Sequence, residues 1–85
     1  MVNSKIINLL LESRPYIITV ETKNGYVYRG KVKYVENNMN FCLENVAILN
    51  KKKYKVFNSV FIRGNSVVII TLPDLLKEAP LFKMF

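Results

Sequence analysis

The chain carries few residues that could do covalent or acid–base chemistry. It has one cysteine, Cys42, no histidine, and six Asp and Glu residues scattered along its length. Without histidine there is no Cys–His or Ser–His pair for nucleophilic catalysis and no usual set of zinc ligands. A lone cysteine excludes an internal disulfide and fits a reducing compartment. These counts predict a protein that is not an enzyme and that needs neither a metal nor a cofactor.

Two short polar stretches are better suited to binding. In VENNMNF, residues 35–41, a turn can use one asparagine for its tolerance of positive φ and a second to begin an Asx turn. Asn40, however, stands where the next strand should begin, and its amide offers two donors and an acceptor. The second stretch is Arg63-Gly64-Asn65, a tight turn between two apolar runs. The asparagine cluster thus has more hydrogen-bonding capacity than a turn requires.

Charge and hydropathy limit the partners of these stretches. The net charge is +7 and the pI is about 9.7, which favours an anionic partner, most commonly nucleic acid. Charge alone does not choose between RNA, DNA and an acidic protein surface. No apolar run is longer than Val67 to Ile70, so we expect no membrane span. The N-terminal residues 1–15 lack a basic start and a cleavage site, and predict a helix instead of a signal peptide.

Periodicity predicts the elements of the first half of the chain. Residues 3–13 carry an apolar stripe at helical spacing, with Asn3 and Ser4 as candidate N-caps, and Pro15 ends the helix. A strand follows, and Asn24-Gly25 predicts a type I′ hairpin turn with positive φ at both positions. The single 85-residue chain predicts one domain.

The return strand, residues 26–36, is long for a globular protein. A glycine within it predicts a sharp bend, which would let one strand serve two sheets and close a small barrel. Its two predicted faces are Tyr28, Gly30, Val32 and Tyr34 on one side and Arg29, Lys31 and Lys33 on the other.

Three further strands are predicted after the asparagine cluster. In the first of them Met39, Phe41 and Leu43 alternate with polar residues, which places Met39 in the core. The next two strands cover residues 54–62 and 66–72. The lysine-rich run 50–53 before them is interpreted as a solvated loop tip, with a phosphate contact as the alternative. The last two strands are apolar at successive positions, as if both faces were covered, and in so small a domain a neighbouring subunit is the economical cover. The predicted interface residues are Val60, Phe61, Ile62, Val67, Val68, Ile69 and Ile70.

Two long stretches of the sequence resemble the Sm protein family. The stretch ITVETKNGYVYRGKVKYVENNMNFCLENV is similar to the first Sm motif, about residues 17–46, and VFIRGNSVVII to the second, residues 60–70. Within the family, ETKNGYVYRGK, ENNMN, VFIRG and LPDLLKEAPLFK resemble the Sm-D-three subfamily. The resemblance implies one Sm domain over residues 1–85: a short N-terminal helix, then a strongly bent five-stranded antiparallel sheet forming an SH3-like small barrel. Residues 73–85 would be a C-terminal extension with a short helical turn.

The resemblance also implies a function. Sm proteins of this kind form a seven-membered hetero-oligomeric ring around the uridine-rich Sm site of spliceosomal small nuclear RNAs, which supports ribonucleoprotein assembly and pre-mRNA splicing. The expected neighbours are the B-type and G-type Sm proteins, and the expected location is the nucleus, with the cytoplasm during assembly. In such rings the fourth strand of one subunit pairs with the fifth strand of the next.

Four residues are implied to face the hole of such a ring. The Asn40 amide would match a uracil edge, and the Arg63 guanidinium would lie against a base face. Gly64 would allow close approach of the backbone, and Asn38 would pack against the base. Two alternatives remain: a related Sm-like ring in RNA decay or chaperoning, or a stand-alone SH3-like barrel that binds peptides. The latter would need an aromatic groove, and the sequence has no tryptophan.

Overall fold

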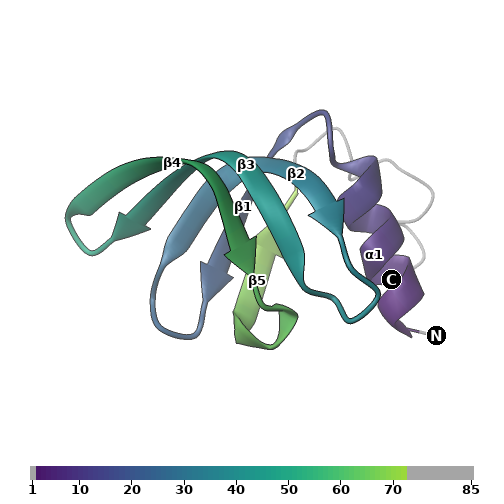
Figure 1. Ribbon diagram of the computed structural model, residues 1–85. Coiled ribbons are helices and arrows are strands. Elements are labelled where there is room, and N and C mark those ends of the chain that lie inside the picture. The colour runs from purple at the N-terminus through teal and green to yellow at the C-terminus, as the bar shows by residue number, and fades with distance from the viewer. Residues whose placement is uncertain (1, 73–85) are drawn as a thin grey trace.

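The computed structural model describes residues 2–72, which form one short helix and a five-stranded antiparallel sheet (Figure 1). The predicted fold, a short N-terminal helix before a bent five-stranded sheet, is confirmed. The predicted C-terminal extension lies outside the described residues. In chain order the elements are α1 (Val2–Glu12), β1 (Ile17–Thr22), β2 (Val27–Val35), β3 (Phe41–Asn50), β4 (Lys53–Ile62), the 3₁₀ turn η1 (Gly64–Ser66) and β5 (Val67–Thr71).

Helix α1 lies across one end of the sheet, beside β2 (Figure 1). It buries Leu9 and Leu10, in line with the predicted apolar stripe. Ser13 ends it: its hydroxyl donates to the Leu10 carbonyl oxygen at 2.6 Å and its N–H donates to that of Leu9 at 3.0 Å. The helix begins at Val2, so the proposed caps, residues 3 and 4, lie inside its first turn and not before it.

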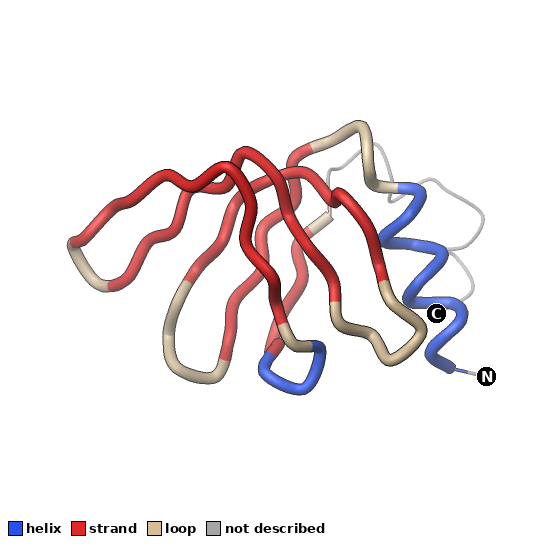
Figure 2. The backbone as a smooth tube through the Cα atoms, in the orientation of Figure 1, coloured by secondary structure: helices blue, strands red, loops and turns tan. Residues whose placement is uncertain are grey.

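The strand order is β4-β3-β2-β1-β5, so β4 and β5 are the two open edges. Figure 2 shows how strongly the long strands curve. The pairing of β2 with β3 shifts register at Gly30, where β3 has an extra residue and Asn45 has φ of 53°. A Cβ at Gly30 would lie 2.9 Å from the Glu44 carbonyl oxygen, so only glycine allows the two strands to approach this closely. The predicted bend therefore coincides with a β-bulge.

A second register shift, between Val32 and Tyr34, reverses the side-chain alternation of β2. Beyond it Val35 packs against the core, whereas Tyr34 is 44% exposed. The prediction that Tyr34 shares the face of Val32 is therefore wrong, because the inserted residue turns it outward. Partial burial raises the pKa of Tyr34, and the neighbouring Cys42 and Glu36 raise it further.

The β1–β2 hairpin also differs from its prediction. Gly25 has φ of 85°, but Asn24 is not among the residues with positive φ, so the turn is not type I′. The Gly25 N–H donates to the Thr22 carbonyl oxygen at 3.0 Å, and the Thr22 N–H donates to that of Tyr26 at 3.0 Å. This pattern is a three-residue loop, in which a turn is followed by a left-handed glycine. The register that buries Thr22 leaves three residues to turn, and a type I′ turn spans only two.

The core lies on the concave side of the bent sheet, where helix α1 meets it. It combines residues of the helix with residues of every strand except β5, so the barrel depends on contacts that are distant in sequence. Side chains of β5 pack against its margin. The buried cluster consists of Leu10, Ile18, Val20, Val32, Phe41, Leu43, Val46 and Ile62.

Candidate functional site

Two loops that are distant in sequence meet at one end of the sheet. The side-chain Oδ1 of Asn40, at the end of the β2–β3 turn, accepts a hydrogen bond from the backbone N–H of Gly64 at 2.9 Å. This bond joins the asparagine cluster to the turn between β4 and β5. We call the residues 38–40 and 63–64 the two-loop site. Three of the four residues predicted to bind RNA are thereby brought together: Asn40 and Gly64 by this bond, and Arg63 by the chain.

The β2–β3 turn is held by its own backbone. The Glu36 N–H donates to the Asn40 carbonyl oxygen at 2.8 Å, and the Met39 N–H donates to that of Glu36 at 3.0 Å. Asn38 is exposed, and its Oδ1 accepts from the Asn40 N–H at 3.2 Å. Asn38 therefore has a local role in shaping the turn. Asn40, which is half-buried, is the residue that connects the turn to the second loop.

Met39 explains why the second loop needs a glycine. A Cβ on Gly64 would lie 2.6 Å from the Met39 carbonyl oxygen and 2.9 Å from its Cβ, so any side chain would separate the loops. Met39 itself has φ of 74° and is only half-buried. The prediction that it belongs to the core beside Phe41 is wrong, because the chain is still turning at this position and β3 begins only at Phe41.

Arg63 combines a fixed backbone with an exposed side chain. Its carbonyl oxygen accepts from the Ser66 N–H at 3.0 Å and from the Ser66 hydroxyl at 2.7 Å, which fixes the turn η1. The guanidinium can therefore extend outward from a backbone whose position is fixed. In Asn40, the bond to Gly64 uses one lone pair of Oδ1, which leaves the two amide protons and the second lone pair. The site can offer an amide and a planar cation to a flat polar ligand.

Most of the exposed large apolar side chains lie on the two edge strands, β4 and β5. Of the predicted interface residues, Phe61, Val68 and Ile69 are exposed, while Val60, Val67 and Ile70 are half-buried and pack against the core. Ile62 is 3% exposed and belongs to the chain's own core. Prediction missed three further exposed apolar residues of β4, because they are interspersed with lysines and do not form an apolar run. They are Tyr54, Val56 and Phe57.

A hollow of about 350 Å³ connects the two-loop site to the β5 edge. Met39, Phe41, Gly64, Val67, Val68 and Ile70 line it.

Within residues 2–72, no helix has the length and apolar character needed to cross a membrane. The same residues hold no group of three His, Cys, Asp or Glu side chains that could bind a metal ion.

The bent sheet, its N-terminal helix and its two open edges define a small β-barrel of the Sm type. The chain belongs to the LSM domain family, which matches residues 8–72. Small nuclear ribonucleoprotein Sm D3 of Caenorhabditis elegans is 44% identical over 78 residues, which cover 91% of this chain and 57% of that protein. The chain thus spans less than two thirds of that relative's length.

Solved archaeal structures share the fold. A heptameric archaeal Sm protein superposes with a TM-score of 0.68 at 18% identity, covering 78% of this chain and 97% of that one. The Sm protein of Pyrococcus abyssii in complex with a uridine heptamer gives a TM-score of 0.69 at 21% identity, covering 78% of this chain and 94% of that one. At these identities the likeness concerns the fold alone.

Proposed function

We propose that the chain is an RNA-binding subunit of a hetero-oligomeric Sm ring that encircles a uridine-rich single strand. The observation that carries the proposal is the hydrogen bond from the Gly64 N–H to Asn40 Oδ1, since it joins the two Sm motifs into one polar site. The same likeness to Sm D3, a small nuclear ribonucleoprotein, supports a role in the spliceosomal small nuclear ribonucleoprotein core. The bound RNA would then be a small nuclear RNA, and the location the nucleus, with assembly in the cytoplasm.

The chemistry of the two-loop site fits uracil. A uracil edge presents carbonyl acceptors and one N–H, and the free amide protons and remaining lone pair of Asn40 can match both. The exposed Arg63 guanidinium can lie against the base face, a contact of the stacking and cation–π type. Asn38, whose Oδ1 already serves the turn, would contribute packing only. The ligand would be held by shape and base edges as well as by charge.

The two open edges fit a ring. Pairing the β4 edge of one subunit with the β5 edge of the next is a heterologous contact, which closes into a ring when the rotation allows. Phe61 on one edge and Val68 and Ile69 on the other would then be covered by neighbours. The hollow beside Gly64 would receive side chains of the neighbouring β4. By likeness to Sm D3, the neighbours would be the B-type and G-type Sm proteins, and residues 1–85 one Sm domain.

This function requires no catalysis. Binding, enclosure and assembly use hydrogen bonds, stacking and strand pairing, and the described residues offer no metal cluster for other chemistry. We accordingly propose a binding subunit, not an enzyme, with no cofactor.

The test is RNA binding by a complex assembled from this chain and its Sm partners. Labelled oligouridine and oligocytidine of equal length are compared by equilibrium titration at a fixed salt concentration. We expect oligouridine to bind more tightly, because cytosine replaces an acceptor carbonyl and the ring N–H of uracil by an amino group and a bare acceptor. Equal affinity for the two oligomers, or a stable monomer that joins no Sm partner, would overturn the proposal. Sequencing of RNA that co-purifies from cells would separate small nuclear RNA from the targets of an RNA-decay ring.

A further inference from the structure

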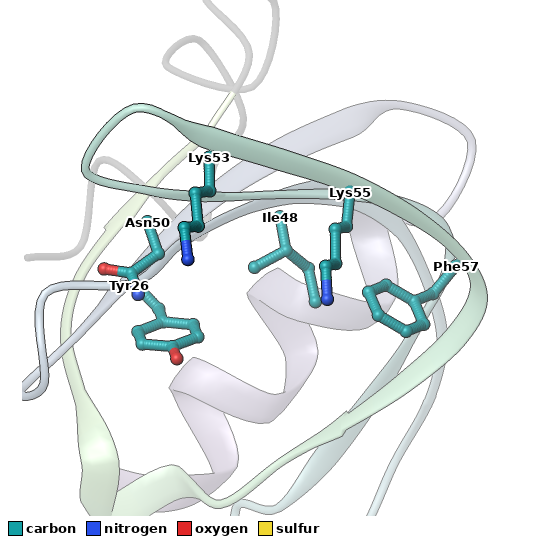
Figure 3. A pocket seen from close by; sticks show the side chains of 6 residues that line it. All are labelled: Tyr26, Ile48, Asn50, Lys53, Lys55 and Phe57. Carbon is teal, nitrogen blue, oxygen red and sulfur yellow. The ribbon is translucent and has the colours of Figure 1, made fainter.

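A second group of polar and aromatic side chains lies at the opposite end of β3 and β4 from the two-loop site. A cavity of about 310 Å³ is lined there by Tyr26, Ile48, Asn50, Lys53, Lys55 and Phe57 (Figure 3). We call these six residues the lysine–tyrosine cavity. Asn40 directly precedes β3 and Asn50 is its last residue, so the two sites are separated by at most about 34 Å along this strand.

Strand pairing explains why these side chains converge. Asn50 pairs with Lys53 and Ile48 pairs with Lys55, and directly paired residues point to the same face of a sheet. Ile48 packs against the core, so both lysines extend from the concave face of the sheet and not from its outer face. Figure 3 shows the two ammonium groups pointing the same way, with the Tyr26 ring on one side and the Phe57 ring on the other.

The aromatic part of the cavity is braced. The Tyr26 ring stacks on that of Tyr28, with centroids 6.2 Å apart and planes inclined by 27°. Tyr28 in turn packs against the core, so Tyr26 is held from behind while its own side chain lines the cavity. Phe57, which is partly exposed, forms the opposite wall. The Tyr26 ring therefore offers a fixed face to a flat apolar group in the cavity.

The charge of the cavity selects an anion. Two of its six lining residues are lysines and, within the described part of the chain, none of the six is acidic. Lys51 and Lys52 are exposed at the adjoining hairpin tip, which adds positive potential. Cationic side chains beside an aromatic platform are the combination that binds single-stranded nucleic acid, through phosphates and stacked bases. An acidic peptide would use the lysines but would leave the aromatic walls without a planar partner.

We infer that the lysine–tyrosine cavity is a second binding site for single-stranded RNA. One base lies against Tyr26, the adjacent phosphate contacts Lys53 and Lys55, and the Asn50 amide lies within the same cavity to meet the base edge. The inference rests on the proposed function, since it assigns the cavity to RNA that continues beyond the two-loop site. It predicts that nucleotides flanking the uridine-rich segment add affinity that the two-loop site does not supply.

The test uses the complex assembled with Sm partners and two probes. One is a short uridine-rich RNA that fills only the two-loop sites, and the other is the same RNA with unstructured extensions at both ends. We expect Lys53→Gln/Lys55→Gln to leave binding of the short RNA unchanged. For the extended RNA, the slope of log affinity against log salt should become shallower by about 1.4, at roughly 0.7 for each of two phosphates. The matched control is Lys31→Gln/Lys33→Gln, which removes the same charge from the outer face of β2.

Tyr26 gives an independent readout. Tyr26→Ala should weaken the extended RNA about 5- to 140-fold, the effect of losing one stacked base, whereas Tyr26→Phe should retain the affinity. The inference is overturned if the extensions add no affinity, if the control variant loses as much as the cavity variant, or if the cavity variant no longer joins its Sm partners. Failure of the wild-type complex to bind even the short RNA would refute the proposed function itself.

Discussion

Asn40 has two separable roles, and substitutions at this position can tell them apart. Its Oδ1 accepts from the Gly64 N–H at 2.9 Å, a bond that holds the two loops together, and its amide protons are available to a ligand. Asn40→Ala removes both functions. Asn40→Asp keeps the acceptor for Gly64 and removes the donor. We therefore expect the alanine variant to lose stability and RNA affinity, and the aspartate variant to lose RNA affinity alone.

The magnitudes follow from the hydrogen bonds involved. Asn40→Ala leaves the half-buried Gly64 N–H without an acceptor, which costs about 1–3 kcal/mol of folding free energy. Asn40→Asp replaces a neutral acceptor by a charged one, so stability should be unchanged or rise by up to about 1 kcal/mol. For RNA, the uracil carbonyl loses its donor, which corresponds to about 5- to 140-fold weaker binding for 1–3 kcal/mol.

The matched control is Asn38→Asp, which adds the same charge two residues away and keeps the bond to the Asn40 N–H. Oligouridine affinity is measured in the assembled complex. Stability is measured by thermal unfolding of the chain bound to one neighbouring Sm protein, and the unfolding is monitored by circular dichroism. We expect the control to weaken RNA binding less than Asn40→Asp. If Asn40→Asp binds oligouridine as well as the wild type, or if the two aspartate variants lose affinity equally, then Asn40 does not read the base.

Three other predictions concern the loops, the edges and a tyrosine. Gly64→Ala should destabilise the fold by about 1–3 kcal/mol in denaturant unfolding, because the alanine Cβ would lie 2.6 Å from the Met39 carbonyl oxygen. Unchanged stability would show that the two loops can move apart at no cost in free energy. Ile69→Asp on the β5 edge should abolish pull-down of the neighbouring subunit. The control is Ile17→Asp, at similar exposure on the internal strand β1, which should leave the pull-down intact. Equal capture by the two variants would show that β5 is not part of the interface. Absorbance titration should show a tyrosine with a pKa above the usual value of about 10, and Tyr34→Phe should remove it.

Much of the fold could be predicted because its strongest signals are local. The apolar stripe before Pro15, the glycine within a long alternating strand and the successive apolar residues of the last strand all agree with the structure. Two of the exceptions share one physical origin, an extra residue. The insertion between Val32 and Tyr34 turns Tyr34 outward, and a third loop residue replaces the expected type I′ turn at Gly25. Register depends on how strands pair across the sheet, which the local sequence does not specify.

The two loops of the candidate site could be located from the sequence, but the contact between them could not. The Sm motifs indicate Asn40, Arg63 and Gly64, yet only the structure shows that Asn40 is bonded to Gly64 across 24 residues. Extending the alternation of β3 backward places Met39 in the core, but this residue lies in a turn, with φ of 74°. The exposed apolar residues of β4, such as Tyr54, are separated by lysines, so periodicity does not distinguish an edge that needs a partner from a solvated strand.

Encirclement of RNA is the central claim, and a topological trap tests it most directly. The complex is assembled on a uridine-rich RNA biotinylated at both ends, streptavidin is then added to one half of the sample, and both halves are transferred to high salt. Salt weakens phosphate contacts, so a ring can leave by sliding off free ends but not past blocked ones. We predict that the complex with blocked ends persists while the complex with free ends dissociates. Equal dissociation of the two samples would contradict encirclement.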